Sequence, residues 1–249
     1  MVRVSAIPYL NTVPFVYGLK QQVVREHIKL GFAVPSLAAY QLQHGLCDVS
    51  IVPVAAIPSF AHADIISSYC IGAIDRVDSV LLCSRTPIEQ IREVALDTDS
   101  RTSVMLMRIL AQEYWQIAPA YRALQASEMS KMSDLPETAV LIGDKALIYG
   151  PQYPYVYDLA QAWQAHTGLP FVFAAWVAGK PLSVDFIAMF SEALSYGISH
   201  IAEALSQTDI PIPQEQALNY LTQRISYNFD VDKQKGMQLF WEKLKTINC

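Results

Sequence analysis

The chain has 249 residues, of which 52% are hydrophobic and 16% are charged. It therefore has enough apolar side chains for a substantial core and lacks the composition of a disordered protein. The net charge is −5 and the lysines and arginines form no basic stripe, which argues against a nucleic-acid-binding surface. No stretch approaches the roughly 20 consecutive apolar residues of a membrane span, so we expect neither a nucleic acid nor a membrane as a partner.

The start of the chain and its cysteines predict a soluble, cytoplasmic protein. Pro8 and Pro14 interrupt the N-terminal segment, which has neither the apolar core nor the cleavage site of a signal peptide. The cysteines and histidines show no metal-ligand or disulfide-framework spacing, so we expect buried free thiols and no bound metal. Free thiols fit a reducing compartment. There is also no GxSxG segment to support a Ser/His/Asp triad.

The first part of the chain alternates between predicted strands and helices. Apolar runs predict strands at 2–7, 28–34 and 47–52. Helices are expected after Thr12, with Pro14 in the first turn, and from Leu37, capped by Pro35-Ser36, because capping residues and an early proline are typical of helix starts. Alternation of this kind, with short loops, indicates a parallel sheet with helices packed on it.

The rest of the chain continues the pattern. It predicts strands at 65–69, 71–74, 79–84, 93–96, 139–142 and 171–177, short or long helices at 87–91, 104–115 and 158–166, and a largely helical region from 184 onward. Two β-rich stretches bracket the middle block, so the chain should cross twice between two lobes. We expect an α/β protein in which residues 1–80 and 177–249 form one lobe and residues 81–176 the other. Each lobe should be a mostly parallel sheet flanked by helices, with the ligand cleft between the lobes at the carboxyl ends of the strands.

The turn after the first predicted strand is the first candidate site. It reads Pro8-Tyr9-Leu10-Asn11-Thr12-Val13-Pro14 and brings an aromatic ring and an amide together between two prolines. Tyr9 and Asn11 suit the binding of a polar ring compound. The alternative is that Asn11 and Thr12 only cap the following helix.

Two helix starts are candidate anion sites. Ser36 follows Pro35, and the segment Ser100-Arg101-Thr102-Ser103 opens a long apolar helix. Free N–H groups, the helix dipole and hydroxyl side chains together favour a carboxylate or phosphate. For Ser36 a simple helix cap is the alternative, and Arg101 has ion pairing with Asp97 or Asp99 as its alternative.

Two further segments carry candidate residues. Gly143 allows a close approach of backbone or ligand, and Asp144 either hydrogen-bonds a substrate hydroxyl or caps the next helix. Trp176 stands in the aromatic strand Phe171-Val172-Phe173-Ala174-Ala175-Trp176-Val177. That strand is either part of the core or, as a crossing between lobes, part of the cleft lining.

Several segments, taken in order, resemble the chorismate dehydratases of the futalosine route to menaquinone. They are SAIPYLNTVP (5–14), PSLAAY (35–40), DVSIVPV (48–54), SVLLCS (79–84), ALDTDSRTSV (95–104), LIGDKAL (141–147) and TGLPFVFAAW (167–176). The resemblance covers most of the chain up to about residue 200 and adds Ser79 to the expected substrate-binding residues. One position departs from the family, which usually has arginine where Asp78 stands, and Arg76 is the nearby replacement.

The resemblance implies a type II periplasmic-binding-protein fold that is used as an enzyme. The implied reaction is the loss of water from chorismate, a small dicarboxylate, to give 3-[(1-carboxyvinyl)oxy]benzoate, by a lyase that needs no metal or organic cofactor. The alternatives are a non-catalytic small-anion-binding or sensor protein of the same fold, and the sister enzyme 1,4-dihydroxy-6-naphthoate synthase.

Roles for the candidate residues follow from this reaction. We expect one carboxylate to be held by Ser100, Arg101, Thr102 and Ser103, and polar groups of the opposite lobe by Ser36. Asn11 should orient the departing hydroxyl or stabilise charge at the reacting carbons, and Tyr9 and Trp176 should flank the ring. Two proton acceptors are open at this point: the enolpyruvyl carboxylate of the substrate itself, and Asp144.

Overall fold

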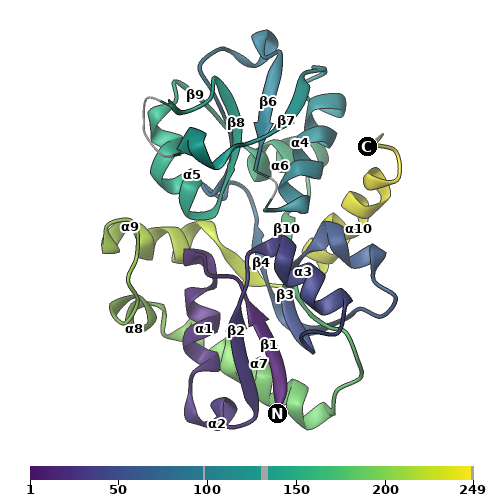
Figure 1. The fold of residues 1–249 in the computed structure, drawn as a ribbon, viewed down its shortest axis with the longest axis vertical. Helices are drawn as coiled ribbons and strands as arrows, with labels where there is room; N and C mark the ends of the chain where they lie inside the picture. Colours follow the sequence, from purple (N-terminus) through teal and green to yellow (C-terminus); the bar gives the residue numbers. More distant parts are fainter. Residues whose placement is uncertain (98, 130–133, 248–249) are drawn as a thin grey trace.

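The computed structural model describes residues 1–97, 99–129 and 134–247, and Figure 1 shows two lobes, each built on its own sheet. The first sheet has the order β11-β4-β10-β3-β1-β2 and the second the order β7-β6-β8-β5-β9. The two-lobed α/β prediction is confirmed in this arrangement. The chain crosses between the lobes from β4 to β5 and again from α6 to β10.

The first sheet lies in the lower lobe of Figure 1. Its strands are β1 (Val2–Ala6), β2 (Ile28–Phe32), β3 (Val49–Pro53), β4 (Asp64–Ala73), β10 (Phe171–Ala178) and β11 (Ser226–Asn228). β1 pairs in parallel with β2 and β3, whereas β10 is antiparallel to β3 and β4, and β11 to β4. Every residue of β3 and β10 is buried, as their continuous apolar sequences predict for strands that are covered on both faces.

The helices of the first lobe surround this sheet. They are the turn η1 (Leu10–Thr12), α1 (Val13–Leu19), α2 (Gln22–Arg25), α3 (Pro35–Gln43), the turn η2 (Val54–Ser59), α7 (Val184–Ser199), α8 (Ile201–Ser206), α9 (Gln214–Asn219), the π-helical turn η7 (Tyr220–Arg224) and α10 (Val231–Leu244). Helix α10 extends upward beside the second lobe (Figure 1), where Lys243 pairs with Glu113 of α4. His166 of α6 contacts the same carboxylate at 3.1 Å.

The second sheet consists of β5 (Val80–Ser84), β6 (Glu93–Leu96), β7 (Ala120–Ala123), β8 (Thr138–Ile142) and β9 (Tyr155–Asp158). Its helices are η3 (Ile88–Gln90), α4 (Arg101–Glu113), η4 (Ala126–Met129), α5 (Gly143–Tyr149), η6 (Gly150–Gln152) and α6 (Leu159–Thr167). β6 is parallel to β7 and β8, while β5 is antiparallel to β8 and β9.

Two details of the predicted architecture are corrected by the pairing. Both sheets are mixed and not mostly parallel, because β10 and β5 are the strands with which the chain enters each sheet after crossing from the other lobe, and each runs against its neighbours. Residues 171–176, predicted for the second lobe, pair with β3 and β4 in the first sheet, so the second crossing precedes β10. Strands β7, β9 and β11 were not predicted from the sequence.

The crossing segments are held together by one carboxylate. Oδ1 of Asp158 accepts hydrogen bonds from the N–H groups of Ala160 and Gln161, at the start of α6. Its Oδ2 accepts from the N–H groups of Val77 and Asp78 at 2.9 and 2.7 Å. Asp158 therefore caps a helix of the second lobe and fastens the first crossing to it.

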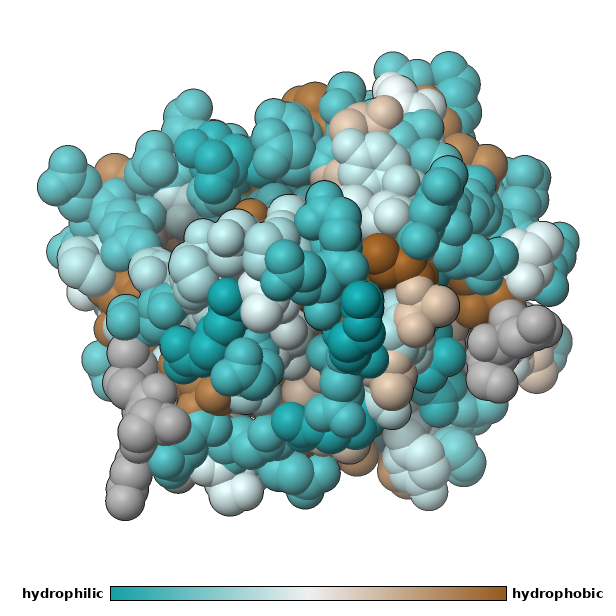
Figure 2. Space-filling model, turned by 90° about the horizontal axis from the view of Figure 1, so that it is seen from above, coloured by the Kyte–Doolittle hydropathy of each residue, from teal (hydrophilic) through white to brown (hydrophobic). Residues whose placement is uncertain are grey.

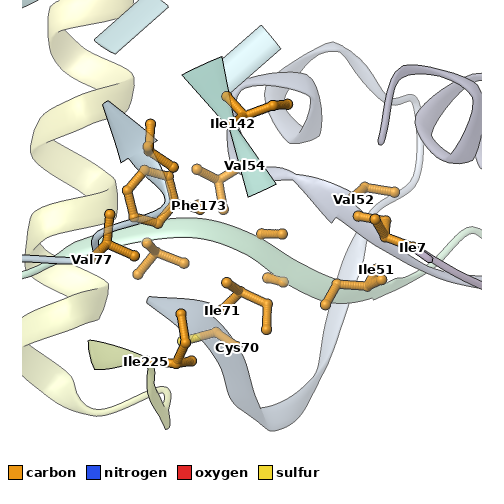
Figure 3. Packing of buried hydrophobic residues seen from close by; sticks show 14 of the residues in the cluster. Ile7, Ile51, Val52, Val54, Cys70, Ile71, Val77, Ile142, Phe173 and Ile225 are labelled. Atoms are coloured by element: carbon orange, nitrogen blue, oxygen red, sulfur yellow. The ribbon is translucent and has the colours of Figure 1, made fainter. Parts of the chain in front are cut away.

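One apolar cluster runs from the first lobe into the second. Figure 3 shows Ile142 of β8 in the same group of side chains as Val54 and Phe173 of the first lobe. Cys47, Cys70 and Cys83 are buried free thiols, as predicted, whereas Cys249 lies outside the described residues. Seen from above the second lobe, the surface is mainly hydrophilic, with hydrophobic residues in small separate groups (Figure 2). Within the described ranges, the helices are too short or too polar to cross a membrane.

Candidate functional site

A cavity lies where the two lobes meet. It is formed mainly by the turn after β1, the start of α4, the junction of β8 with α5, the first crossing segment and β10. Its lining residues are Ile7, Tyr9, Asn11, Thr12, Pro35, Pro53, Ile71, Val77, Ser79, Val80, Ser100, Ser103, Ile142, Gly143, Phe173 and Ala174. The structure thus brings six of the predicted site residues together, namely Tyr9, Asn11, Ser79, Ser100, Ser103 and Gly143.

The turn after β1 is fixed from both sides. The buried hydroxyl of Thr12 hydrogen-bonds the main-chain oxygens of Ile7 and Tyr9. From the other side, the phenol of Tyr227 donates to the main-chain oxygen of Asn11 at 3.0 Å. The Asn11 amide is therefore carried on a rigid turn and faces the cavity.

Tyr9 lies against a glycine of the opposite lobe. Gly143 has φ +55, and a Cβ atom at this position would come within 2.9 Å of Cδ2 of Tyr9. Glycine is thus required both by the backbone conformation and by the aromatic ring. Burial, followed by the charges of Asp97, Asp99 and Asp144, raises the pKa of the Tyr9 phenol well above its ordinary value, so this phenol stays protonated at neutral pH.

The start of α4 presents two hydroxyls to the cavity. Oγ of Ser100 accepts from the N–H of Ser103 at 3.4 Å and from its hydroxyl at 3.1 Å. Because Ser100 accepts both bonds, its own proton remains for a ligand. The predicted hydroxyl cluster also included Thr98, which lies outside the described residues.

Arg101 and Thr102 lie away from the cavity, contrary to prediction. Arg101 is exposed. Thr102 has no exposed surface, and its Oγ1 accepts a hydrogen bond at 3.1 Å from the N–H of Ala55 in η2. Successive residues of a helix start point in different directions, so only Ser100 and Ser103 of this segment line the cavity.

Asp144 also joins the lobes and does not line the cavity. Its Oδ1 accepts a hydrogen bond from the N–H of Leu10 at 3.0 Å, and its side chain lines a second hollow on the other side of Tyr9. Burial raises the pKa of the Asp144 carboxyl above its ordinary value. Its neighbour Lys145 pairs with Asp97 at 2.8 Å and with Asp99 at 3.5 Å.

Trp176 and Ser36, which were also predicted to bind the substrate, do not line the cavity. Trp176 is fully buried in the core, with its ring centroid 5.8 Å from that of Phe15 and 5.1 Å from that of Phe190. Phe173 and Ala174 of the same strand line the cavity instead, next to a register shift between β10 and β4. Ser36 is half-buried at the start of α3, where Pro35 is the residue that lines the cavity.

Ser79 contacts a residue that the sequence analysis missed. The phenol of Tyr220, in η7, donates to Oγ of Ser79 at 2.7 Å. The neighbouring Asp78 has φ 62 and pairs with Arg76 at 2.5 Å and with Arg224 at 2.7 Å. The guanidinium of Arg76 is therefore bound to Asp78 and does not replace the family's arginine in the cavity. Tyr220 lies far along the chain from every predicted site residue, so no local pattern indicated it.

The polar groups around the cavity are neutral. They are hydroxyls and an amide, and among the described residues neither a lysine nor an arginine lines the cavity. An anion in this cavity would be held by hydrogen-bond donors and by the N–H groups at the start of the 13-residue helix α4. In the parts of the chain that the structure describes, no three His, Cys, Asp or Glu side chains are grouped as metal ligands.

The two-lobed fold with a cavity between the lobes is that of the periplasmic-binding-protein class. The chain is similar over 98% of its length to protein AF1704 of Archaeoglobus fulgidus, with a TM-score of 0.76, 14% identity and 97% of that chain covered. It is also similar to the periplasmic aliphatic sulphonate binding protein of Escherichia coli, with a TM-score of 0.58, 17% identity and coverage of 99% and 94% of the two chains. At these identities the similarity shows the fold alone.

The sequence comparisons identify the family. Residues 2–246 match the family model described as menaquinone biosynthesis, and the chain belongs to this family. A chorismate dehydratase from Thermus thermophilus is 26% identical over 217 residues, which cover 78% of this chain and 77% of that protein. The predicted family resemblance is confirmed.

Proposed function

We propose that this protein is a chorismate dehydratase, which converts chorismate to 3-[(1-carboxyvinyl)oxy]benzoate and water on the futalosine route to menaquinone. The observation that carries the proposal is the interlobe cavity, which is lined jointly by Asn11, Ser79, Ser100 and Ser103. The similarity to a chorismate dehydratase over most of both chains supports it. The buried free thiols suit the cytoplasmic location that we also propose.

The polar lining suits a substrate with two carboxylates. In this proposal one carboxylate is bound by the hydroxyl of Ser100, whose oxygen accepts the Ser103 hydroxyl proton, and by the free N–H groups at the start of α4. The ring lies between Tyr9 and Phe173, which takes the role predicted for Trp176. Fixed neutral donors bind an anion without bringing a strongly hydrated cation into the cavity, and they need not reorganise during the reaction.

The reaction mainly requires that the substrate be held in the correct orientation. The C3–H bond breaks and its electron pair forms the new ring double bond, while the C4–O bond breaks and the departing hydroxide takes up a proton to become water. Because the product ring is aromatic, the driving force is large, and positioning together with charge stabilisation does most of the catalytic work. Asn11 donates to the departing hydroxyl or to the charge that develops on the ring.

The proton acceptor we propose is the enolpyruvyl carboxylate of the substrate. Asp144, the alternative, uses its carboxylate to accept the N–H of Leu10 and lies outside the main cavity. A carboxylate engaged in that contact is poorly placed to reach a substrate proton. The enolpyruvyl carboxylate, by contrast, is part of the substrate, so that binding of chorismate places it in the cavity together with the C3–H bond.

The proposal is tested by incubating the protein with chorismate and following the appearance of the aromatic product. Asn11→Ala and Asn11→Asp should lower kcat by about 100-fold or more while changing the dissociation constant of chorismate by less than about threefold. Asn228→Ala, at an exposed position of the edge strand β11, is the matched control and should leave kcat unchanged. Binding of chorismate without turnover would exclude the lyase and indicate a binding or sensor protein instead.

A further inference from the structure

The segment from Tyr220 to Tyr227 contacts two of the elements that form the cavity, the first crossing segment and the turn after β1. Arg224 pairs with Asp78 of the first crossing at 2.7 Å, and Tyr227 donates to the main-chain oxygen of Asn11 at 3.0 Å. Tyr220 is 3% exposed and stands at the start of η7. The C-terminal part of the chain, which shares no motif with the predicted site, therefore contacts residues that form or adjoin the cavity.

The phenol of Tyr220 lies against two residues that line the cavity. Its O–H donates to Oγ of Ser79 at 2.7 Å, and the side chain of Asn11 acts on the same phenol to lower its pKa. A phenol has a single proton to donate. Since that proton goes to Ser79, the Asn11 amide can meet the phenol oxygen only through its N–H groups.

The directions of these bonds determine what the ligand meets. An Asn11 N–H group that faces the Tyr220 oxygen leaves the second N–H and the carbonyl oxygen of the amide for the cavity. With a lone pair of the Ser79 oxygen occupied by the phenol, the Ser79 proton is directed away from Tyr220. Ser79 is 1% exposed and lines the cavity, so that its proton is available to a bound ligand.

We infer that Tyr220 is a positioning residue for the dehydration proposed above: its phenol orients the Asn11 amide and the Ser79 hydroxyl as donors toward the substrate. The inference rests on the proposed function. Tyr220 does not line the main cavity, so it acts through its two partners and not on the substrate. Burial raises the pKa of the Tyr220 phenol well above its ordinary value, so the phenol keeps its proton throughout the neutral range.

The first test is Tyr220→Phe, which removes only the phenol oxygen. We expect kcat for chorismate to fall by about 10- to 100-fold with KM changed by less than about threefold, because the donors lose their orientation toward the reacting atoms while the walls of the cavity stay in place. Tyr153→Phe is the matched control. Tyr153 is 6% exposed and its hydroxyl donates to the main-chain oxygen of Pro136 at 2.9 Å, away from the cavity. Both variants should lower Tm by similar amounts, and only Tyr220→Phe should lower kcat.

The second test separates orientation from general destabilisation. Tyr220→Phe is combined with Asn11→Ala, and single-turnover rates are measured with the enzyme in excess. If the phenol acts through Asn11, the loss caused by Tyr220→Phe should shrink by at least about fivefold in the Asn11→Ala background, since coupled residues are not additive.

The outcomes are distinguishable. An unchanged kcat in Tyr220→Phe, an equal loss of kcat in Tyr153→Phe, or a full loss repeated in the Asn11→Ala background would each overturn the inference while leaving the dehydratase proposal intact. Wild-type protein that does not convert chorismate would overturn the proposed function, and this inference with it.

Discussion

Two hydrogen bonds join the lobes, one on each side of the cavity. Both have a main-chain N–H of the first lobe as donor, but the acceptor is a carboxylate on one side and a hydroxyl on the other. On one side the N–H of Leu10 in η1 donates to the carboxylate of Asp144, the second residue of α5, at 3.0 Å. On the other side the N–H of Ala55 in η2 donates to the hydroxyl of Thr102, the second residue of α4, at 3.1 Å. Each bond links a turn that follows a strand of the first sheet to a helix start in the second lobe.

The difference between the sides is one of charge. Thr102 is fully buried and neutral, so its bond does not depend on pH. Asp144 is half-buried, and burial raises the pKa of its carboxyl, which means that its ionised form is disfavoured in the folded protein. The contact on the Asp144 side should therefore stabilise the fold less than the contact on the Thr102 side at neutral pH.

The largest effect is expected for Gly143→Ala, on the Asp144 side. A side chain here must adopt the left-handed conformation at φ +55 and also displaces the ring of Tyr9, whose Cδ2 would lie 2.9 Å from the new Cβ. We expect the free energy of unfolding to fall by about 2 to 4 kcal/mol, and kcat/KM for chorismate to fall by about tenfold or more.

Gly168→Ala is the control for Gly143→Ala. Gly168 has φ +74, but a Cβ there meets nothing within 4 Å. Gly168→Ala therefore introduces backbone strain without a steric clash. The free energy of unfolding should fall by only about 1 to 2 kcal/mol, and kcat/KM should be unchanged. Equal losses in the two variants, measured by chemical denaturation and by turnover, would contradict the close packing of Tyr9 on Gly143.

The next largest effect is expected for Thr102→Val, on the other side. The substitution keeps the shape of the side chain but leaves the N–H of Ala55 without its acceptor. We expect a loss of about 1 to 3 kcal/mol in the free energy of unfolding, which lowers Tm by about 3 to 10 °C. Thr222→Val, at an exposed position, should change Tm by less than about 2 °C. A Thr102→Val protein as stable as wild type would show that this contact does not hold the lobes together.

Asp144→Asn should have a smaller effect on stability than Thr102→Val, and it should raise Tm where Thr102→Val lowers it. The folded-state pKa of Asp144 is raised, so its stabilising contribution is present at low pH and is lost as the pH rises through that pKa. Asparagine keeps an acceptor for Leu10 without the charge, and we expect Tm at pH 7 to rise by about 1 to 3 °C, with the difference vanishing toward pH 4. Asp64→Asn, at an exposed position, should show no such pH dependence.

The same variant tests the proton acceptor. If the substrate carboxylate takes the proton, Asp144→Asn should retain kcat within about threefold. A loss of kcat by more than about 100-fold would instead make Asp144 the base.

The smallest effect is expected for Arg101→Ala. The Arg101 side chain is exposed, and solvent ions screen its charge from a substrate held inside the cavity. KM for chorismate should change by less than about twofold at physiological ionic strength. Ser103→Ala is the comparison, because it removes a buried hydroxyl that lines the cavity and donates to Ser100. It should raise KM by about fivefold. A larger effect for Arg101 than for Ser103 would show that charge, not the neutral donors, binds the substrate.

Local rules predicted much of the fold. The helix starts near Pro35 and Ser100 follow from capping residues and proline to within two or three residues, and most strands of the first sheet follow from their apolar runs. The need for glycine at position 143 was also visible, although not its reason, which is the Tyr9 ring from the opposite lobe. Short strands such as β7 and β11 were missed because most of their residues are exposed or half-buried and form no apolar run.

The candidate site was only partly predictable. Ser100 and Thr102 belong to the same four-residue motif, yet the fold uses one hydroxyl in the cavity and the other between the lobes. Trp176 and Phe173 share one strand, but only Phe173 reaches the cavity. Which face of a helix or strand meets a ligand depends on the neighbouring elements, and that information is not local.

By itself, the sequence determined the two-lobed α/β class, the family, and the turn and helix start that supply Asn11 and Ser100. These features depend on hydrophobic periodicity, capping and short motifs, all of which act within a few residues. The tertiary structure alone decided that Asp144 and Thr102 join the lobes, that Trp176 belongs to the core, and that Tyr220 holds two cavity residues. Each of those roles arises from a contact between segments far apart in the chain, where burial and the geometry of the partner decide what a side chain does.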